Sequence, residues 1–201
     1  FNTENFSNYN VLVFDQQFWK HSYISLINTA VIRFGDYSDA LATGTEFKIA
    51  DKNNNYGVKG SAAMSHRFLD TLLHDKAYDN GYRYRIFFEK FSGNFTFGVG
   101  QRTISKQFNI NDMGFIGRTN FMISTARANY KVFKPVGLML RMWSKLEFNY
   151  ERLYRPSVFT RISLGGEWGS TLKNFLSLGA DFKVEPMGYR DYFEPRTDGR
   201  Y

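Results

Sequence analysis

The side chains best suited to chemistry in this 201-residue sequence are three histidines, His21, His66 and His74, and the serine beside one of them. A serine hydrolase needs its serine within reach of a base that a third group orients. Ser65 and His66 are neighbours in an extended stretch, where successive side chains point to opposite faces, so they cannot form such a dyad. No Gly-x-Ser-x-Gly motif occurs. We therefore expect no catalytic residue here, and any hydrolase activity would lie outside this segment.

Two stretches could hold a metal ion, and neither has the full ligand pattern. The run 51–57 opens like a calcium loop, but Gly57 comes one place late and Ala62 stands where such a loop needs a glutamate. A hairpin turn rich in Asn and Asp explains it better. His74 has aspartates near it in the segment 70–79, which is typical of a solvated surface loop. The chain has no cysteine, and the sequence predicts neither a metal site nor a cofactor.

Charge and composition favour some classes of protein over others. The net charge of +7 comes from 26 Lys and Arg residues against 19 Asp and Glu residues, spread along the chain. No run of five or more basic residues occurs, so we expect no nucleic-acid partner. No apolar run of about 18 residues is present, so no transmembrane helix is expected. Aromatic residues make up 18% of the sequence, which fits either a β-rich soluble core or the aromatic girdles of a membrane barrel.

Alternation of apolar and polar residues is clearest in the stretch 138–152. Its even positions are mostly apolar, as at Leu138, Leu140, Met142, Leu146 and Phe148. Its odd positions are mostly charged or polar, as at Arg141, Lys145, Glu147, Asn149 and Glu151. In a strand, this pattern gives one apolar and one charged face. At helical spacing the charges would fall within the apolar stripe, so the pattern predicts a strand.

Ten stretches, the first two of them nearly apolar on both faces, are predicted as antiparallel strands that pair as hairpins: 8–18, 22–33, 40–50, 55–67, 81–91, 95–106, 117–131, 138–152, 157–168 and 175–185. Tight links near 19–21, 51–54, 92–94, 134–135 and 170–174 alternate with longer polar links near 34–39, 68–80, 107–117, 153–156 and 186–201. Outer-membrane barrels have this alternation, and strands of ~11–13 residues can cross a bilayer at a tilt. The expected fold is all-β: a transmembrane, antiparallel, up-and-down β-barrel segment forming one domain over residues 1–201. A soluble lipocalin-like barrel is the alternative.

The cost of charge in lipid decides which face we expect to line the lumen. A Lys or Arg on the outer wall at the bilayer midplane costs about 2–4 kcal/mol. The charged residues that we therefore assign to the lumen are Arg83, Arg85, Glu89, Arg127, Arg141, Lys145, Glu147, Arg161, Glu167, Asp181 and Lys183. Opposite charges on adjacent strands can pair. The set describes either a rigid salt-bridged wall, or a polar channel or a surface that holds a plug.

Two of the longer links combine aromatic rings with Asp and Arg side chains. Such mixtures occur in sugar-stacking platforms and in loops packed on themselves. We call these two stretches the motif links. The residues that stand out are Asn111, Asp112, Gly114, Phe115 and Arg118 in the first, and Asp191, Tyr192, Glu194, Pro195 and Arg196 in the second.

The motif links and the strand layout resemble the C-terminal barrel domain of a Bacteroidota outer-membrane family. That domain is classed as one of unknown function, and it commonly follows a carbohydrate-binding family 9-like domain. The family pattern Asn-Asp-Leu-Gly-Phe-Leu-Arg-Arg is changed here at Met113, Ile116 and Gly117, and the pattern Asp-Tyr-Tyr-Glu-Pro-Arg is changed at Phe193. The family barrel is longer than this chain, so the resemblance implies a segment of a larger barrel. No catalytic residue is carried over.

The resemblance also implies a location and a set of partners. We expect the outer membrane of a Gram-negative, Bacteroidota-type bacterium, with outer-membrane lipid as one partner and glycans or other outer-membrane proteins as candidate partners. The leading hypothesis is a surface binding or transport role, related to glycans or as a subunit of an outer-membrane assembly. One alternative is a structural or accessory barrel that docks other membrane proteins. The other is a membrane-embedded hydrolase.

Overall fold

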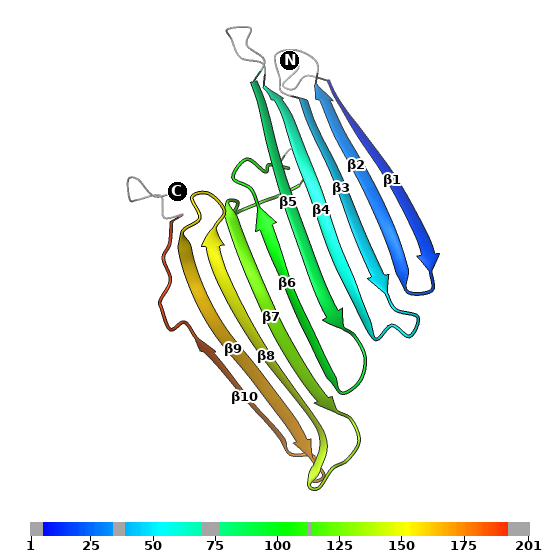
Figure 1. Cartoon of the computed structure of the whole chain (residues 1–201), viewed down its shortest axis with the longest axis vertical. Helices are drawn as coiled ribbons and strands as arrows, with labels where there is room; N and C mark the ends of the chain where they lie inside the picture. The colour runs from blue at the N-terminus through cyan, green and yellow to red at the C-terminus, as the bar shows by residue number, and fades with distance from the viewer. Residues whose placement is uncertain (1–5, 34–38, 70–76, 112–113, 193–201) are drawn as a thin grey trace.

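The computed structural model describes residues 6–33, 39–69, 77–111 and 114–192, which form ten β-strands (Figure 1). Their bounds are β1 Ser7–Trp19, β2 Ser22–Arg33, β3 Asp39–Ala50, β4 Tyr56–Leu69, β5 Ala77–Lys90, β6 Phe95–Ile104, β7 Phe121–Val132, β8 Met139–Leu153, β9 Phe159–Leu172 and β10 Ser177–Val184. All ten predicted strands are present, which confirms the all-β class. Among the described residues, no helix is long and apolar enough to cross a membrane.

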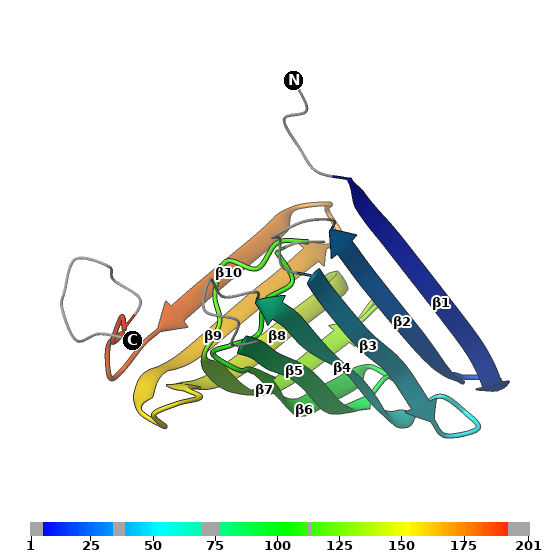
Figure 2. The same ribbon diagram turned by 90° about the horizontal axis from the view of Figure 1, so that it is seen from above.

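The strands form one sheet in chain order, and each strand pairs antiparallel with the next. This confirms the up-and-down arrangement predicted from the alternation of strands and links. The sheet is bent into an open trough (Figure 2). In the part of the chain that the structure describes, β1 and β10 are the two edges and do not pair with each other. The sheet of the described strands is therefore open and is not closed into a barrel.

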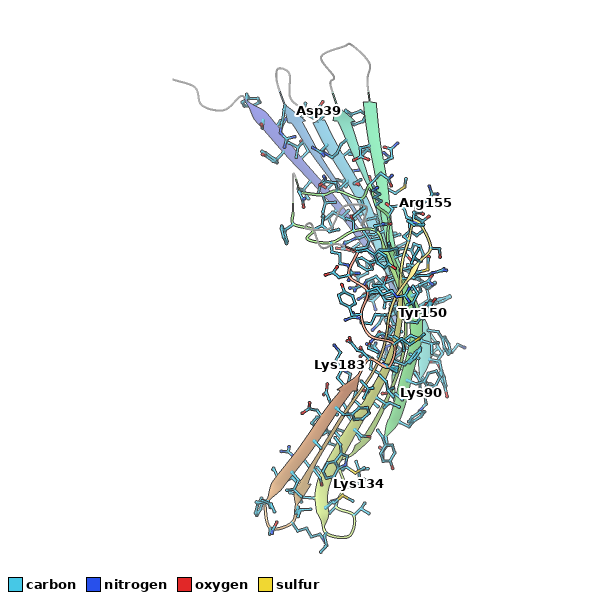
Figure 3. All side chains as sticks on the ribbon, turned by 90° about the vertical axis from the view of Figure 1, so that its left-hand side faces the viewer. Asp39, Lys90, Lys134, Tyr150, Arg155 and Lys183 are labelled. Atoms are coloured by element: carbon cyan, nitrogen blue, oxygen red, sulfur yellow. The ribbon has the colours of Figure 1, made fainter. Side chains whose placement is uncertain are left out.

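The hairpin turns lie at one end of the sheet, and the other links lie at the opposite end. Figure 3 places Lys134 near the first end and Asp39 toward the second. The turn after β3 is the Asn- and Asp-rich hairpin that the sequence predicts. The backbone N–H of Asn54 donates to the Asp51 carbonyl at 3.0 Å, and the N–H of Asn55 donates to the Asp51 carboxylate at 2.6 Å. Asn54 has a φ of 53°, which asparagine tolerates better than most residues.

The predicted contrast between tight and long links is wrong for the link between β7 and β8. β7 ends at Val132 and β8 begins at Met139, so this link is longer than the one between β8 and β9. Val136 and Met139 exchange two backbone hydrogen bonds, at 2.9 and 3.0 Å, and this bridge adds a second small reversal. The reversal passes through Gly137, whose φ of 57° is one that glycine adopts without strain.

From β3 to β10 each strand has one charged or polar face and one mostly apolar face, and the register keeps each set together, whereas β1 and β2 are largely apolar on both faces. Arg127 of β7 is opposite Glu147 of β8, and Lys145 of β8 is opposite Glu167 of β9. We call the face with these residues the inner face and the opposite one the outer face. The sheet is a single layer, seen nearly edge-on in Figure 3. Its accessible surface is 13889 Å², whereas a compact protein of this mass exposes about 9,800 Å².

The described residues between β6 and β7, 105–111 and 114–120, fold back over the inner face and build a small core. We call them the folded-back segment, and Figure 2 shows them inside the trough. Phe108 is 1% exposed and packs in a cluster with Phe121. Gly81 of β5 leaves the necessary room, because a Cβ there would lie 2.1 Å from the Cα of Phe108. The inner face is therefore the concave one, since it is the face that this segment covers.

Several strand limits differ from the prediction for local reasons. β7 begins at Phe121 rather than at residue 117, because the Asn120 N–H donates to the Ser105 carbonyl at 3.4 Å and ties these residues to the folded-back segment. β5 begins before residue 81, since its pairing with β4 continues as far as Leu69. β9 extends to Leu172, where it still pairs with β8, and β10 is shorter than predicted.

Replacing Gly81 with alanine should destabilise the domain, because the new Cβ would meet the backbone of Gln107 and Phe108 at 2.1 to 2.4 Å. Overpacking of this kind costs about 1–3 kcal/mol. The matched control is Gly165→Ala, also on the inner face, where the Cβ meets only the Phe182 carbonyl oxygen at 3.7 Å. The measurements are the free energy of unfolding in urea and the rate of tryptic cleavage after Lys106. Equal values for the two variants would contradict this packing.

Candidate functional site

All eleven charged residues that the sequence assigns to a lumen lie on the inner face. Arg83, Arg85 and Glu89 are on β5, Arg127 is on β7, Arg141, Lys145 and Glu147 are on β8, Arg161 and Glu167 are on β9, and Asp181 and Lys183 are on β10. The register produces this result, because residues of one face stand opposite residues of the same face on each neighbouring strand. The charges therefore form one continuous surface.

Glu89 of β5 is the centre of one ion cluster on this surface. Its side chain is 4% exposed, and it binds Lys59 of β4 at 2.6 Å and also Arg127 of β7. Arg127 lies two strands away, and Gly98 of β6 occupies the position between them. A Cβ at Gly98 would lie 3.1 Å from Arg127 and 3.2 Å from Glu89, so the glycine lets this pair close. Two cations thus compensate one buried carboxylate.

Glu151, near the end of β8, is the centre of a second cluster. Its side chain is 1% exposed, and its two oxygens bind Arg161 of β9, at 2.9 Å, and Arg118 of the folded-back segment. Arg161 also lies 3.6 Å from Glu185. The pKa of Glu185 is held below its usual range, first by the hydrogen bond from Lys183 and then by the charges of Lys183 and Arg161. This cluster therefore joins three parts of the chain.

The two motif links meet at the Glu151 cluster. Arg118 comes from the first link, and Tyr189 begins the part of the second that lies against Arg161, with the guanidinium 5.4 Å from the ring centre. Burial raises the pKa of Tyr189, and the nearby charges of Arg118 and Asp191 act on it in opposite directions. The structure thus brings together two stretches that are far apart in the sequence.

The other motif residues have local roles or lie outside the described residues. The side-chain oxygen of Asn111 accepts the Ile116 backbone N–H at 2.8 Å and so shapes the first link. Gly114 and Phe115 are exposed, and Phe115 is 88% exposed; Tyr192 is half-buried. The motif residues outside the described part of the chain are Asp112, Glu194, Pro195 and Arg196.

Two open hollows adjoin on the inner face, and both are lined by Glu147 and Asn149. The first, which we call the tryptophan hollow, has a volume of about 530 Å³ and is lined also by Trp143, Glu167 and Asp181. The second, the basic hollow, has a volume of about 400 Å³ and contains the cations Lys59, Arg85, Arg102, Arg127 and Arg161. Together they form a polar track across the inner face.

Trp143 can lie flat in the tryptophan hollow because glycine stands opposite it. Trp143 pairs with Gly169 in the register, and a Cβ at Gly169 would lie 2.6 Å from the indole ring. Trp143 nevertheless keeps 42% of its surface exposed. An exposed aromatic ring among carboxylate and amide side chains provides both a stacking surface and hydrogen-bonding groups.

The outer face has a different composition and is almost free of formal charge. In the described strands, the charged residues that the register places there are Asp39, Lys90 and Arg152, and each lies within two residues of a strand end. Between the ends, large apolar side chains are exposed, among them Leu146 at 48% and Phe182 at 49%. The outer face therefore presents a broad apolar band.

Aromatic rings on the outer face gather toward both ends of the strands. Toward the hairpin turns, Tyr56, Phe88, Phe97 and Phe95 form a chain of ring contacts with centroids 6.1 to 6.5 Å apart. Toward the other end, the rings of Tyr82 and Tyr154 are 5.8 Å apart, and those of Tyr150 and Phe159 are 6.1 Å apart. The two groups border the apolar band.

Several uncharged polar side chains of the outer face are hydrogen-bonded to the next strand. Asn28 donates to Thr43 at 2.7 Å. The Tyr84 hydroxyl donates to Gln101 at 2.9 Å, and Gln101 donates to Ser124 at 3.3 Å. Pairing of this kind lowers the cost of placing polar groups in an apolar environment.

The structure keeps Ser65 and His66 on opposite faces, as the sequence predicts. The Ser65 hydroxyl accepts the Asn109 backbone N–H at 3.0 Å on the inner face, whereas His66 contacts Asn80 at 2.7 Å on the outer face. Within the described residues, no group of three or more His, Asp or Glu side chains could hold a metal ion. The aspartate-flanked His74 lies outside them.

Three prominent inner-face residues are not among the lumen residues predicted from the sequence: Arg102, Trp143 and Glu151. All three occupy inner positions of the alternating pattern, so the signal for their face is present in the sequence. The inner-face position of Arg102 is hard to predict from the sequence. Glycines occupy the two inner positions before it on β6, so no polar side chains mark the alternation there. The burial of Glu151 depends on Arg118, which comes from a link. The alternation of residues in the strands gives no information about such a contact.

A family model described as a domain of unknown function, DUF5916, matches residues 1–201. The chain belongs to the DUF5916 family. The match confirms the coarser part of the resemblance, namely a domain family of unknown function that covers the whole sequence. No curated protein and no solved structure matches the chain significantly.

Removing the charge of Glu151 should destabilise the DUF5916 domain, because two cations would remain beside a buried neutral amide. Breaking a buried ion pair costs about 3–5 kcal/mol, and we expect the lower end because Arg118 and Arg161 stay partly exposed. The control is Glu147→Gln, since the half-exposed pair of Glu147 and Lys145 is worth about 1 kcal/mol or less. The measurement is the free energy of unfolding in urea of Glu151→Gln and its control. A loss at Glu151 no larger than at Glu147 would contradict the central role of this carboxylate.

Proposed function

We propose that this domain is part of the wall of an outer-membrane β-barrel, in a Gram-negative bacterium of the Bacteroidota type, and that its inner face binds or passes a solute at the cell surface. The observation that carries the proposal is the division of charge between the two faces. Eleven charged residues selected from the sequence share the inner face, while Asp39, Lys90 and Arg152 on the outer face lie near strand ends.

The outer face has the composition that lipid requires. A Lys or Arg at the bilayer midplane costs about 2–4 kcal/mol, and no formally charged side chain lies in the middle of the outer face of the described strands. The two groups of aromatic rings occupy the levels at which barrels carry aromatic girdles. A soluble lipocalin-like barrel would instead place its apolar face inside and its charges outside.

An open sheet cannot cross a membrane alone, because its edge backbone groups would be unpaired in lipid. The edges here are β1 and β10. The proposal therefore requires further strands that join these two edges and complete a barrel. A larger barrel is also what the resemblance of the motif links implies, and it would place the hollows of the inner face along a lumen.

Leu146→Arg tests the lipid-facing assignment of the outer face. Leu146 is 48% exposed in mid-strand, so an arginine there would be harmless in water but should cost about 2–4 kcal/mol in a bilayer. Asn149→Arg, on the inner face of the same strand, is the matched control. The measurements on the full-length protein are its yield in the outer-membrane fraction and its free energy of unfolding in liposomes. Equal yields and equal free energies of unfolding for the two variants would contradict the membrane proposal.

The tryptophan hollow favours glycans as the class of solute. Trp143 offers a ring for stacking against the apolar face of a sugar, and Glu167, Asp181 and Asn149 offer hydrogen-bonding groups around it. The hollow, at about 530 Å³, is within the range of small-molecule sites. The same surface can hold a soluble oligosaccharide or guide one through a lumen.

Trp143→Ala should weaken oligosaccharide binding by at least about fivefold, because loss of a stacking ring typically removes about 1–3 kcal/mol by analogy with aromatic stacking of bases. Phe148→Ala is the control, since Phe148 lies on the outer face of the same strand and does not line the tryptophan hollow. The measurement is calorimetric titration of the full-length protein with malto-, cello- and xylo-hexaose, together with their uptake into liposomes. Absence of both binding and uptake for all three sugars would contradict a glycan role and favour an accessory barrel.

A further inference from the structure

Two arginines of the inner face stand directly opposite each other without a carboxylate partner. Arg85 of β5 pairs in the register with Arg102 of β6. Like charges directly opposite on adjacent strands are destabilising. In the described part of the chain, neither guanidinium forms an ion pair. Two acids share this row, and each is two strands from the nearer arginine. Glu46 of β3 accepts a hydrogen bond from Tyr23 at 2.9 Å, and Glu151 of β8 is bound by Arg118 and Arg161.

The other cations of the basic hollow are already compensated. Lys59 and Arg127 share the buried Glu89, and Arg161 binds the buried Glu151. These carboxylates lie beneath the surface, so they neutralise their partners without offering an acceptor to the hollow. Glu147, on its wall, is paired with Lys145. Arg85 and Arg102 therefore supply an uncompensated positive charge at the centre of the hollow.

Arg102 is also held in place by its surroundings. Its guanidinium lies 5.1 Å from the centre of the Phe121 ring, and Phe121 belongs to the small core under the folded-back segment. Arg85 and Arg102 are both exposed and both line the hollow. Two guanidinium groups on neighbouring strands, one of them stacked on a buried ring, present several N–H donors to the same volume.

We propose that the basic hollow is a binding site for an oxyanion, with Arg85 and Arg102 as the residues that hold it. Arginine matches carboxylate, sulfate and phosphate groups through paired, charge-assisted hydrogen bonds. A bound oxyanion would also relieve the repulsion between the two guanidinium groups. Thr125 and Asn149, which line the same hollow, add polar groups for the rest of the ligand.

This inference adds to the proposed function that the solute is negatively charged. It rests on that function only for its biological context. The basic hollow adjoins the tryptophan hollow at Glu147 and Asn149. A single acidic oligosaccharide could therefore place a sugar ring at Trp143 and an anionic group between the two arginines. Oxyanion binding itself requires neither a membrane nor the tryptophan.

The test is calorimetric titration of the full-length, detergent-purified protein with sodium sulfate, sodium phosphate and sodium glucuronate, at constant ionic strength. Glucose serves as the uncharged probe. We expect saturable binding of at least one oxyanion, at least tenfold weaker in Arg85→Gln and in Arg102→Gln. Lys131→Gln removes one exposed positive charge from the inner face of β7, outside the hollow, and should bind as the unmodified protein does. Binding of glucuronate alone would identify an acidic sugar, whereas binding of all three would identify the oxyanion itself as the recognised group.

Two results would overturn the proposal: no saturable heat with any of the three anions, or equal affinity in the double variant Arg85→Gln/Arg102→Gln. Thermal unfolding at low salt shows whether the variants are folded. We expect the melting temperature of each single variant to equal or exceed that of the unmodified protein, since an opposed pair of like charges is removed. If one variant fails to fold, the other decides the matter. Failure here with normal hexaose binding at Trp143 would leave the proposed function intact.

Discussion

The register of the ten-stranded sheet is the constraint on which everything else in this protein depends. Side chains alternate between faces with a period of two, so a shift of one residue in any pair would move a whole strand of charges to the other face. In the observed register, rows such as Glu89, Gly98 and Arg127 run across three strands on one face. The ion clusters, the hollows and the uncharged outer face are all consequences of that alignment.

Within this frame, glycines and buried carboxylates organise the inner face. Gly98 leaves space for Glu89 to reach Arg127, and Gly81 leaves space for the folded-back segment at Phe108. Glu151 then ties that segment to β9 through Arg118 and Arg161. A carboxylate out of water is stable only when cations and hydrogen bonds compensate it, so each cluster fixes the relative position of the chain segments that meet there.

The ion pairs divide the cations of the inner face into those that hold the structure together and those that can bind a solute. Lys59, Arg127 and Arg161 are occupied by buried acids, and their role is to hold strands and links together. Arg85 and Arg102 oppose each other and have no acid of their own. The chemical character that we propose for the solute follows from this contrast, and it agrees with our proposal of a barrel wall whose outer side faces lipid and whose inner side faces water.

The ten strands can be predicted from the sequence alone, and for β3 to β10 so can the division of residues between two faces, because alternation with period two is a local property of an extended chain. This division places all eleven selected charges on the face where the structure has them. Which of these charges meet is set by the tertiary structure. Glu151 and Arg118 are separated by a link that folds back over the sheet, and Arg85 meets Arg102 only because of the strand register. Contacts of this kind depend on link geometry and on pairing between strands, and neither leaves a periodic trace in the sequence.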